Sequence, residues 1–207
     1  GPDDAIRLTR NAQPALFATS MAALAVLTAK TGQTVATLAD FTAGHSLGEY
    51  SALAAAGSIS IADGARLLRL RGDAMQNAVA VGEGAMAAIL GADEALITKI
   101  VTEAGDVGVV QLANDNAPGQ IVISGSAGAV DRAMEISRDK GLRKVIKLPV
   151  SAPFHCDLMA PAAEAMAAAL SNVFFADAAL PVICNVTAAG EQKADALKAN
   201  LITQITG

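Results

Sequence analysis

The chain of 207 residues is 53% hydrophobic and carries a formal net charge of −5. It has no basic excess to favour nucleic acid, and aromatic residues, which stack on bases, make up only 3% of it. This length and hydrophobic content suffice for one sizeable core, or for one core with a small satellite domain. Cys156 and Cys184 provide neither a disulfide framework nor a metal-ligand spacing, so we expect a reducing cytoplasm and no metal or cofactor.

Residues 12–29 carry no charge and superficially resemble a secretory signal or a membrane span. The segment is mostly alanine and includes Gln13 and Pro14, so its hydrophobicity is mediocre for a span. Asn11 as a helix cap, with Pro14 in the first turn, predicts instead a buried helix of a soluble protein over about 13–30.

The next segments predict a turn, a path to the sequence FTAGHS, and two helices. The first helix is short and ends at Gly57, a plausible C-terminal cap. The second begins at Ser60, because Ser60 and Asp63 fit the [ST]-x-x-[DE] pattern of a helix start.

The pattern changes after Gly82 and Gly84. Residues 82–148 predict the order β-α-β-β-α-β, which is that of a ferredoxin-like unit. We therefore expect an inserted ferredoxin-like subdomain over 82–148, within a core formed by 1–81 and 149–207. In that second part of the core, the pattern predicts a helix over 157–171, a strand-like PVICNVT and a polar tail.

Ser46 lies at the centre of a G-x-S-x-G motif. Such a serine can be the nucleophile of a strand-to-helix turn, in a strained conformation with its hydroxyl exposed. The flanking positions must be small where strand and helix crowd them, and Gly44 and Gly48 supply this. The N–H of Leu47 would then point at a developing oxyanion. A glycine-rich turn with an N-capping serine remains the alternative, because the motif alone is weak.

A serine hydroxyl needs a base to take its proton. The two histidines of the chain are His45 and His155. His45 is adjacent to Ser46, so its side chain should point away from the hydroxyl. His155 lies in a proline-bearing segment at the subdomain's exit. This segment is either a catalytic loop that carries the base or a loop in which His155 has no such role. Cys156 is a weaker candidate nucleophile, since no second histidine is free to activate it.

Arg71 lies in the middle of the apolar face of its predicted helix. On a helical wheel the polar residues form one arc, and the apolar residues, among them Ile61 and Met75, form the opposite one. Burying an unpaired charge costs several kcal/mol, so an arginine there must snorkel out or meet an anion. That anion is either a carboxylate of the protein or a substrate carboxylate bound bidentately.

Five motifs in order closely resemble the malonyl-CoA:acyl-carrier-protein transacylases of fatty acid synthesis and their relatives, the polyketide synthase acyltransferase domains. They are GHSLGEYSALAAAG, RLLRLRG, GAMAAILG, NDNAPGQIVISG and LPVSAPFHCDLM, and they cover nearly the whole chain. The resemblance implies an α/β fold, with an α/β-hydrolase-like core that carries a ferredoxin-like subdomain. It also implies a cytoplasmic enzyme that acts on malonyl-CoA and acyl carrier protein, not on nucleic acid or a membrane.

Site roles follow from the same resemblance. Ser46 would be the acylated nucleophile, His155 its general base and acid, and Leu47 an oxyanion donor. Arg71 would bind the malonyl carboxylate. The pocket would be lined by Met75, Met86, Asn116 and Phe154, and PFH at 153–155 is similar to the AFH associated with malonyl selection.

The resemblance also implies segments outside this chain. Relatives begin with a strand and a GQGSQ loop whose glutamine helps form the oxyanion hole, and they continue past residue 207. We therefore expect a piece lacking both ends. Besides the acyltransferase, two alternatives stay open: a serine hydrolase of the thioesterase or lipase type, and an inactive, carrier-binding or structural fragment. A basic stretch over 138–147 could dock an acidic carrier, or could simply be a solvated face.

Overall fold

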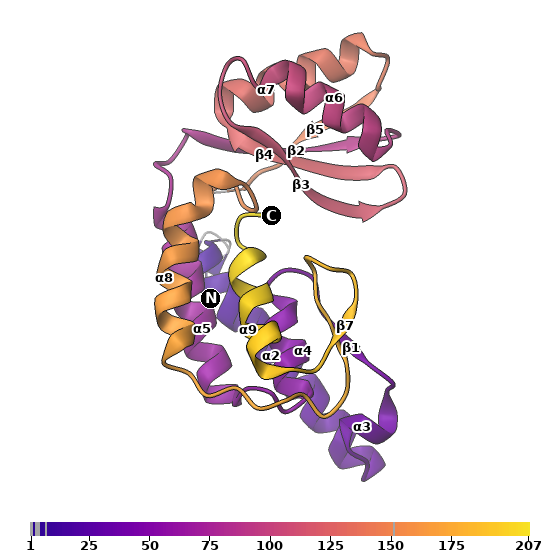
Figure 1. Cartoon of the computed structure of the whole chain (residues 1–207), viewed down its shortest axis with the longest axis vertical. Helices are drawn as coiled ribbons and strands as arrows, with labels where there is room; N and C mark the ends of the chain where they lie inside the picture. Colours follow the sequence, from indigo (N-terminus) through magenta and orange to yellow (C-terminus); the bar gives the residue numbers. More distant parts are fainter. Residues whose placement is uncertain (1, 3–4, 7, 151) are drawn as a thin grey trace. The chain divides into compact units, whose positions relative to one another are not determined.

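The computed structural model describes residues 2, 5–6, 8–150 and 152–207 (Figure 1). Ser151, inside the motif expected to carry the catalytic histidine, lies outside the described residues. The fold is mixed α/β with two small sheets. The chain is divided into two compact units. The first unit comprises 1–74 with 164–204, and the second 75–163 with 205–207.

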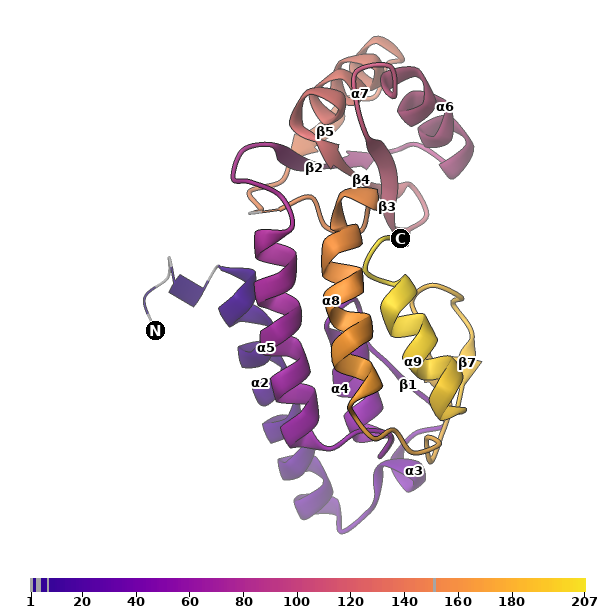
Figure 2. The same cartoon turned by 60° about the vertical axis from the view of Figure 1, so that its left-hand side comes forward.

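The first unit contains helices around a three-stranded sheet. Its elements are α2 (Thr9–Thr31), α3 (Val35–Leu38), β1 (Thr42–Ala43), α4 (Gly48–Ala55), β6 (Val182–Ile183), β7 (Gly190–Glu191) and α9 (Ala194–Thr203), joined by most of α5 (Ile61–Asn77) and α8 (Ala160–Ser171). The sheet order is β1-β6-β7, with β1 parallel to β6 and β7 antiparallel to it. Helices α2 and α4 pack against each other and lie side by side in both views (Figure 2).

Several expectations about the helices of the first unit are confirmed. Ser60 Oγ accepts the N–H of Asp63 at 3.0 Å and donates to its Oδ2 at 2.5 Å, so this pair caps α5 as predicted. Gly57 follows α4 with a φ of 76°, and the N–H of Ser58 donates to the carbonyl of Leu53. This left-handed glycine ends the helix as expected.

Other expectations for the first unit are wrong. Helix α2 begins at Thr9, and Asn11 does not cap it but donates to the carbonyl of Ala5. The helix is largely exposed, with Gln13, Phe17 and Met21 its buried residues. PVICNVT yields only the short strand β6, and the predicted polar tail contains α9 instead. Leu197 and Leu201 on α9 are fully buried, because even this polar sequence has an apolar stripe.

Helix α2 is long and apolar enough to cross a membrane by length and composition. In its most apolar window 11% of the residues are buried inside the structure. The same test is met by core helices of soluble proteins and by signal sequences, so it does not decide among them.

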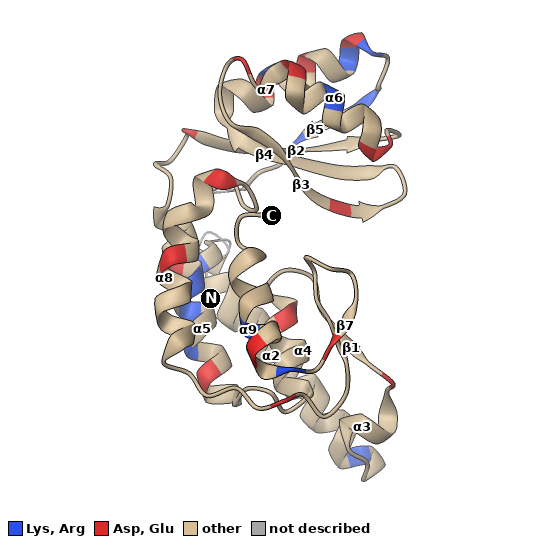
Figure 3. Cartoon of the chain, in the orientation of Figure 1, with Lys and Arg blue, Asp and Glu red and all other residues tan. Residues whose placement is uncertain are grey.

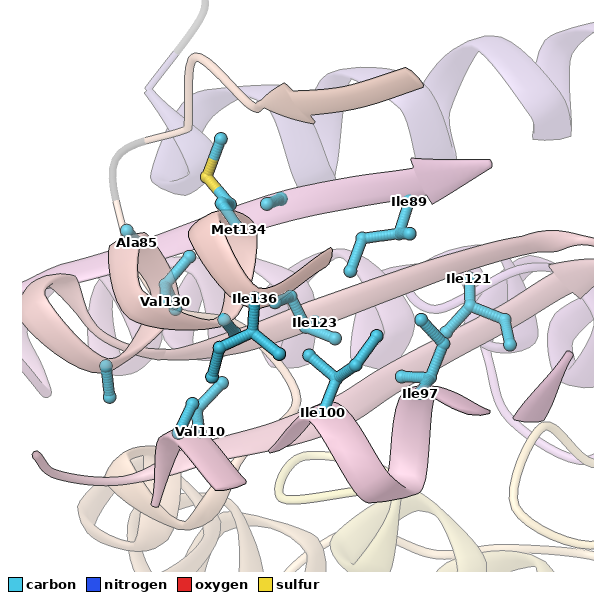
Figure 4. Packing of buried hydrophobic residues seen from close by; sticks show 14 of the residues in the cluster. Ala85, Ile89, Ile97, Ile100, Val110, Ile121, Ile123, Val130, Met134 and Ile136 are labelled. Carbon is cyan, nitrogen blue, oxygen red and sulfur yellow. The ribbon is translucent and has the colours of Figure 1, made fainter. Parts of the chain in front are cut away.

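The second unit has the order predicted for residues 82–148. Its elements are β2 (Gly84–Leu90), α6 (Glu94–Ala104), β3 (Val110–Ala117), β4 (Gln120–Ser126), α7 (Ala127–Asp139), β5 (Lys144–Lys147) and the 3-10 turn η1 (Asp157–Met159). All pairs in the sheet β3-β4-β2-β5 are antiparallel. Helices α6 and α7 bury their apolar faces on it, and Ile97, Ile100 and Val130 meet Ile89 and Ile123 there (Figure 4).

Candidate active site

Ser46 lies on the sharp turn between β1 and α4. Its φ of 51° is in the left-handed region, which a residue other than glycine adopts only under strain. A Cβ on Gly44 would overlap the carbonyl oxygen of Gly48, so the chain can turn here only with glycine at 44. A Cβ on Gly48 would meet nothing, so the expectation that this position is crowded is wrong. The predicted strand-turn-helix context of the motif is confirmed.

Asn185 fastens the two arms of this turn. Its Oδ1 accepts the N–H of Ser46 at 2.6 Å, and its Nδ2 donates to the carbonyl of Gly44 at 2.7 Å. The residue follows β6, the strand that pairs with β1, so the pairing of the sheet brings it to the turn. A side chain from the far end of the chain thus supports the strained backbone at Ser46.

Arg71 is buried, with 1% of its surface exposed, so it does not snorkel out to solvent, which was one of the two options that its place on the helical wheel left open. Its Nη2 donates to Ser46 Oγ at 3.1 Å. Its other acceptors are neutral amide oxygens: Nη1 donates to Gln13 Oε1 at 2.7 Å and Nη2 to Gln204 Oε1 at 2.9 Å. The Nε atom is buried without a hydrogen-bond partner. Within the described part of the chain, no carboxylate forms an ion pair with Arg71 within 4.0 Å.

Helix α5 otherwise follows the predicted wheel only in part. Leu67, Leu68 and Met75 on the apolar arc are buried, but Ile61 at the start of the helix is 59% exposed. Gln76, which falls on the polar arc, is buried. The end of a helix projects beyond its neighbours, and burial there depends on packing that a wheel does not contain.

Glu49 is buried one turn after Ser46. Its Oε2 accepts from Gln204 Nε2 at 2.8 Å and from the N–H of Asn185 at 2.9 Å. Burial raises the pKa of Glu49, and the hydrogen bonds from Asn185 and Gln204, the Cys184 thiol and the charge of Arg71 oppose this rise. Burial likewise lowers the pKa of Arg71.

Four residues of this site are not predicted from the sequence: Gln13, Glu49, Asn185 and Gln204. Gln13 is 58 residues away from Arg71 and Gln204 is 133 residues away, so no local pattern joins them. A usable signal existed only for Gln13. It lies on the same stripe of α2 as Phe17 and Met21, at the four-residue spacing of one helix face.

Leu47 occupies the position directly before α4, next to Ser46, where its N–H belongs to the start of the helix. The structure therefore brings Ser46, Leu47 and Arg71 together in the first unit. The other predicted site residues belong to the second unit, and their grouping with Ser46 stays a prediction. Met75 and Met86 are buried, Phe154 is half-buried and Asn116 is exposed on β3.

His155 has the same unusual backbone as Ser46. Its φ is 57°, it is 7% exposed, and it lies two residues before the turn η1. Two contacts within the second unit fix this segment. Gly84 approaches the ring of Pro153 so closely that a Cβ there would overlap it, and Gln111 both donates to Asp157 Oδ2 and accepts the N–H of Asp157. Strained residues of this kind persist where their surroundings over-determine them, as at functional sites.

A strained serine on a G-x-S-x-G turn, in contact with a buried arginine, places the chain in the class of α/β proteins built around a candidate serine nucleophile. Comparison with known proteins specifies the class further. Residues 2–204 match the acyl transferase domain family, and the chain belongs to this family.

The relatives that the chain resembles carry one type of name. It is 51% identical to the malonyl CoA-acyl carrier protein transacylase of Bacillus subtilis, over an alignment of 209 positions that covers 99% of this chain. It superposes with a TM-score of 0.96, at 51% identity and complete coverage, on acyl-carrier-protein-S-malonyltransferase from Bartonella henselae. It also superposes, with a TM-score of 0.95, 40% identity and complete coverage, on a malonyl-transacylase in complex with its type II PKS acyl-carrier protein. The chain spans 63% of the Bacillus protein and 66% of each of the two structures.

Proposed function

We propose that the protein transfers a malonyl group from malonyl-CoA to the phosphopantetheine thiol of an acyl carrier protein through a malonyl-serine intermediate. The names of the relatives and the complex with a carrier protein support this substrate and this partner. We further propose an α/β-hydrolase-like core, over 1–81 and 149–207, with a ferredoxin-like subdomain over 82–148. The order and the antiparallel pairing of β2 to β5 support the second part of this description.

The observation that carries the proposal is the contact between Arg71 Nη2 and Ser46 Oγ at 3.1 Å. A guanidinium binds a carboxylate with two parallel N–H donors. In a malonyl thioester, the carboxylate carbon is only two bonds from the carbonyl carbon that a serine attacks. A cation in direct contact with the nucleophile therefore matches a short diacid, and its unpartnered Nε leaves a donor for the second carboxylate oxygen.

The reaction would proceed in two halves. The Ser46 hydroxyl attacks the thioester carbonyl, His155 takes the proton, and coenzyme A leaves as its thiol with a proton returned from His155. The thiol of the carrier then gives its proton to His155 and attacks the serine ester, a malonyl thioester forms as the bond to Ser46 Oγ breaks, and His155 returns the proton to Ser46. The N–H of Leu47 would stabilise the oxyanion in both halves, and loss of one such donor typically costs a factor of about 10² to 10³.

The test is intact-mass measurement after incubation with malonyl-CoA and, separately, with acetyl-CoA. We expect a malonyl adduct that disappears in Ser46→Ala and is strongly reduced in Arg71→Ala, and with acetyl-CoA only a much slower adduct. Circular dichroism of each variant checks that it is folded. Turnover of neutral esters that survives Arg71→Ala would favour a serine hydrolase instead. A folded protein without any adduct would overturn the proposal.

For the cellular location, we infer a cytoplasmic protein, which the two free, buried cysteines, Cys156 and Cys184, support. Among the described residues, no group of three or more His, Cys, Asp or Glu is placed to hold a metal ion.

A further inference from the structure

We propose that Glu49 is a positioning residue that orients both the Arg71 fork and the Ser46 turn, and so sets the preference for acyl groups that carry a carboxylate. The inference rests on the proposed function. It assigns a role to a buried acid that lies outside the serine, histidine and arginine of that mechanism. The carboxylate acts through two partners, Gln204 and Asn185.

The first partner, Gln204, links Glu49 to Arg71. Its Nε2 donates to Glu49 Oε2 at 2.8 Å and to the carbonyl of Ser46 at 3.1 Å, while its Oε1 accepts from Arg71 at 2.9 Å. An ionised carboxylate only accepts hydrogen bonds and a guanidinium only donates them. The amide can satisfy both neighbours in one orientation alone, because the flipped amide would place donor against donor and acceptor against acceptor. Glu49 therefore fixes which face of Gln204 is turned to Arg71.

The second partner, Asn185, links Glu49 to the nucleophile. Its backbone N–H donates to Glu49, while its side chain accepts the N–H of Ser46 and donates to the carbonyl of Gly44. Glu49 thus anchors the residue that bridges the two arms of the turn. Loss of this anchor should loosen the position of the Ser46 hydroxyl for every acyl donor, charged or neutral.

The interposed amide also decides how the charge of Arg71 is balanced. Arg71 and Glu49 attract each other across the site, but Gln204 stands between them and no direct ion pair forms. A carboxylate paired directly with Arg71 would occupy the donors that a substrate needs. The relay through Gln204 stabilises the buried cation from a distance and leaves its Nε unpartnered. One acid can in this way support a buried arginine without competing for it.

The link from Glu49 through Gln204 to Arg71 and the link through Asn185 to the Ser46 turn predict different kinetic effects, so their roles can be separated. Gln204→Leu breaks the link to Arg71 and also the hydrogen bond to the carbonyl of Ser46, so we expect the KM for malonyl-CoA to rise at least tenfold while acylation by slow, neutral acetyl-CoA falls much less. Asn185→Ala breaks the link to the Ser46 turn, and we expect acylation by both donors to slow by a similar factor. Asn185 is exposed, so its truncation should leave the fold intact.

Glu49 itself should combine both effects. In Glu49→Ala we expect the KM for malonyl-CoA to rise and the rate of acylation by both donors to fall. Glu49→Gln retains an acceptor oxygen for Gln204 and Asn185 and should recover most of the loss. Ser51→Ala, on the same helix and with a buried hydroxyl that lacks a partner, is the matched control and should match the unmodified protein.

Each outcome of these rapid-mixing acylation experiments is decisive. If the unmodified protein forms no malonyl adduct, the proposed function fails. If it does, but the Glu49 and Gln204 variants lower acylation by malonyl-CoA and acetyl-CoA by one common factor, Glu49 is only structural. Should Glu49→Ala not fold, the contrast between Gln204→Leu and Asn185→Ala still decides, since equal donor dependence in these two variants overturns the inference.

Discussion

Neutral groups surround the buried cation of Arg71: two amide oxygens, a hydroxyl and an aromatic ring. The guanidinium carbon lies 5.8 Å from the centroid of the Tyr50 ring, within the range of a cation–π contact. Full burial of a charge without an opposite charge beside it costs several kcal/mol, and these contacts stabilise the buried guanidinium. Burial also raises the pKa of Tyr50 to about 12, so the ring remains neutral at any physiological pH.

The hydroxyl of Tyr50 provides the first prediction. It is buried without a hydrogen-bond partner, whereas the ring beneath Arg71 is the useful part of the side chain. We expect Tyr50→Phe to leave the free energy of unfolding unchanged or to raise it by about 1 kcal/mol, because an unsatisfied buried group is removed. Urea unfolding measures this, and a loss of more than about 1 kcal/mol would show that the hydroxyl is bonded after all.

Glu49 provides the second prediction, on the pH dependence of stability. Its pKa is raised in the folded protein, so the folded state holds this proton more tightly than the unfolded state does. Stability from this group is present at low pH and is lost as the pH rises through the folded pKa. Glu49→Gln cannot lose a proton, and its stability relative to the unmodified protein should therefore increase with pH from about pH 4 and then level off.

Urea unfolding of the two proteins over this range is the measurement. The other ionisable groups that face Glu49 are Arg71, Tyr50 and Cys184. Arginine stays charged, and burial raises the pKa of both Tyr50 and Cys184, so none of the three should titrate in the acidic range. A stability difference that is constant with pH would contradict the raised pKa of Glu49.

At the scale of elements, the turn between β1 and α4 depends on one glycine and not on two. The sequence predicted both Gly44 and Gly48 as crowded, but the chain folds back so that only Gly44 faces the backbone of residue 48. The geometry of a turn decides which of its small residues must be small, and a motif spacing does not record it.

The difference between Gly44 and Gly48 provides the third prediction. Gly44→Ala should disrupt the turn, lower the free energy of unfolding by several kcal/mol and abolish Ser46 acylation, because its methyl group would overlap backbone that cannot move aside. Gly48→Ala should be tolerated and is expected to stabilise α4 slightly, by about 0.5–1 kcal/mol. Thermal unfolding and intact-mass acylation of the pair provide the check, and equal damage from both variants would contradict the described turn.

Element prediction succeeded where the signal was local. The capping pair at Ser60 and Asp63, the glycine stop at Gly57 and the β-α-β-β-α-β order depend on neighbouring residues and were found. The helix α9 was missed, since its sequence ADALKANLIT is polar on most of its surface and its buried leucines stand four residues apart. The start of α2 was misplaced because a plausible cap, Asn11, lay inside a helix whose true beginning carries no capping side chain.

At the scale of the whole molecule, charge offers a hypothesis about the carrier protein. The chain is acidic overall, yet Arg138, Lys140, Arg143, Lys144 and Lys147 follow one another along the end of α7 and β5 (Figure 3). Lys140 pairs with Glu103 and Lys147 with Asp131. Arg143 and Lys144, by contrast, are exposed, and no carboxylate within the described ranges lies within 4.0 Å of either.

The fourth prediction tests this basic stretch over 138–147 as a docking surface. We expect Lys144→Glu to raise the KM for an acidic acyl carrier protein several-fold and to weaken its salt dependence, with acylation by malonyl-CoA unchanged. Lys99→Glu, an equal charge change at another exposed lysine of the second unit, is the control. An equal effect of both variants would identify a general charge effect and not a docking surface.

The sequence by itself determined the family resemblance, the candidate nucleophile, the place of Arg71 on the apolar face of its helix and the order of the elements over 82–148. These depend on periodicity, turn chemistry and motif spacing, which are written in neighbouring residues. Only the tertiary structure decided what surrounds Arg71. Gln13, Glu49, Asn185 and Gln204 come from α2, α4, the segment after β6 and the end of α9. The stripe of α2 indicates burial for Gln13, but no local pattern names its partner or marks the other three. A polar side chain finds its partner through the packing of distant elements, so the amide relay between Arg71 and Glu49 exists only in the folded chain.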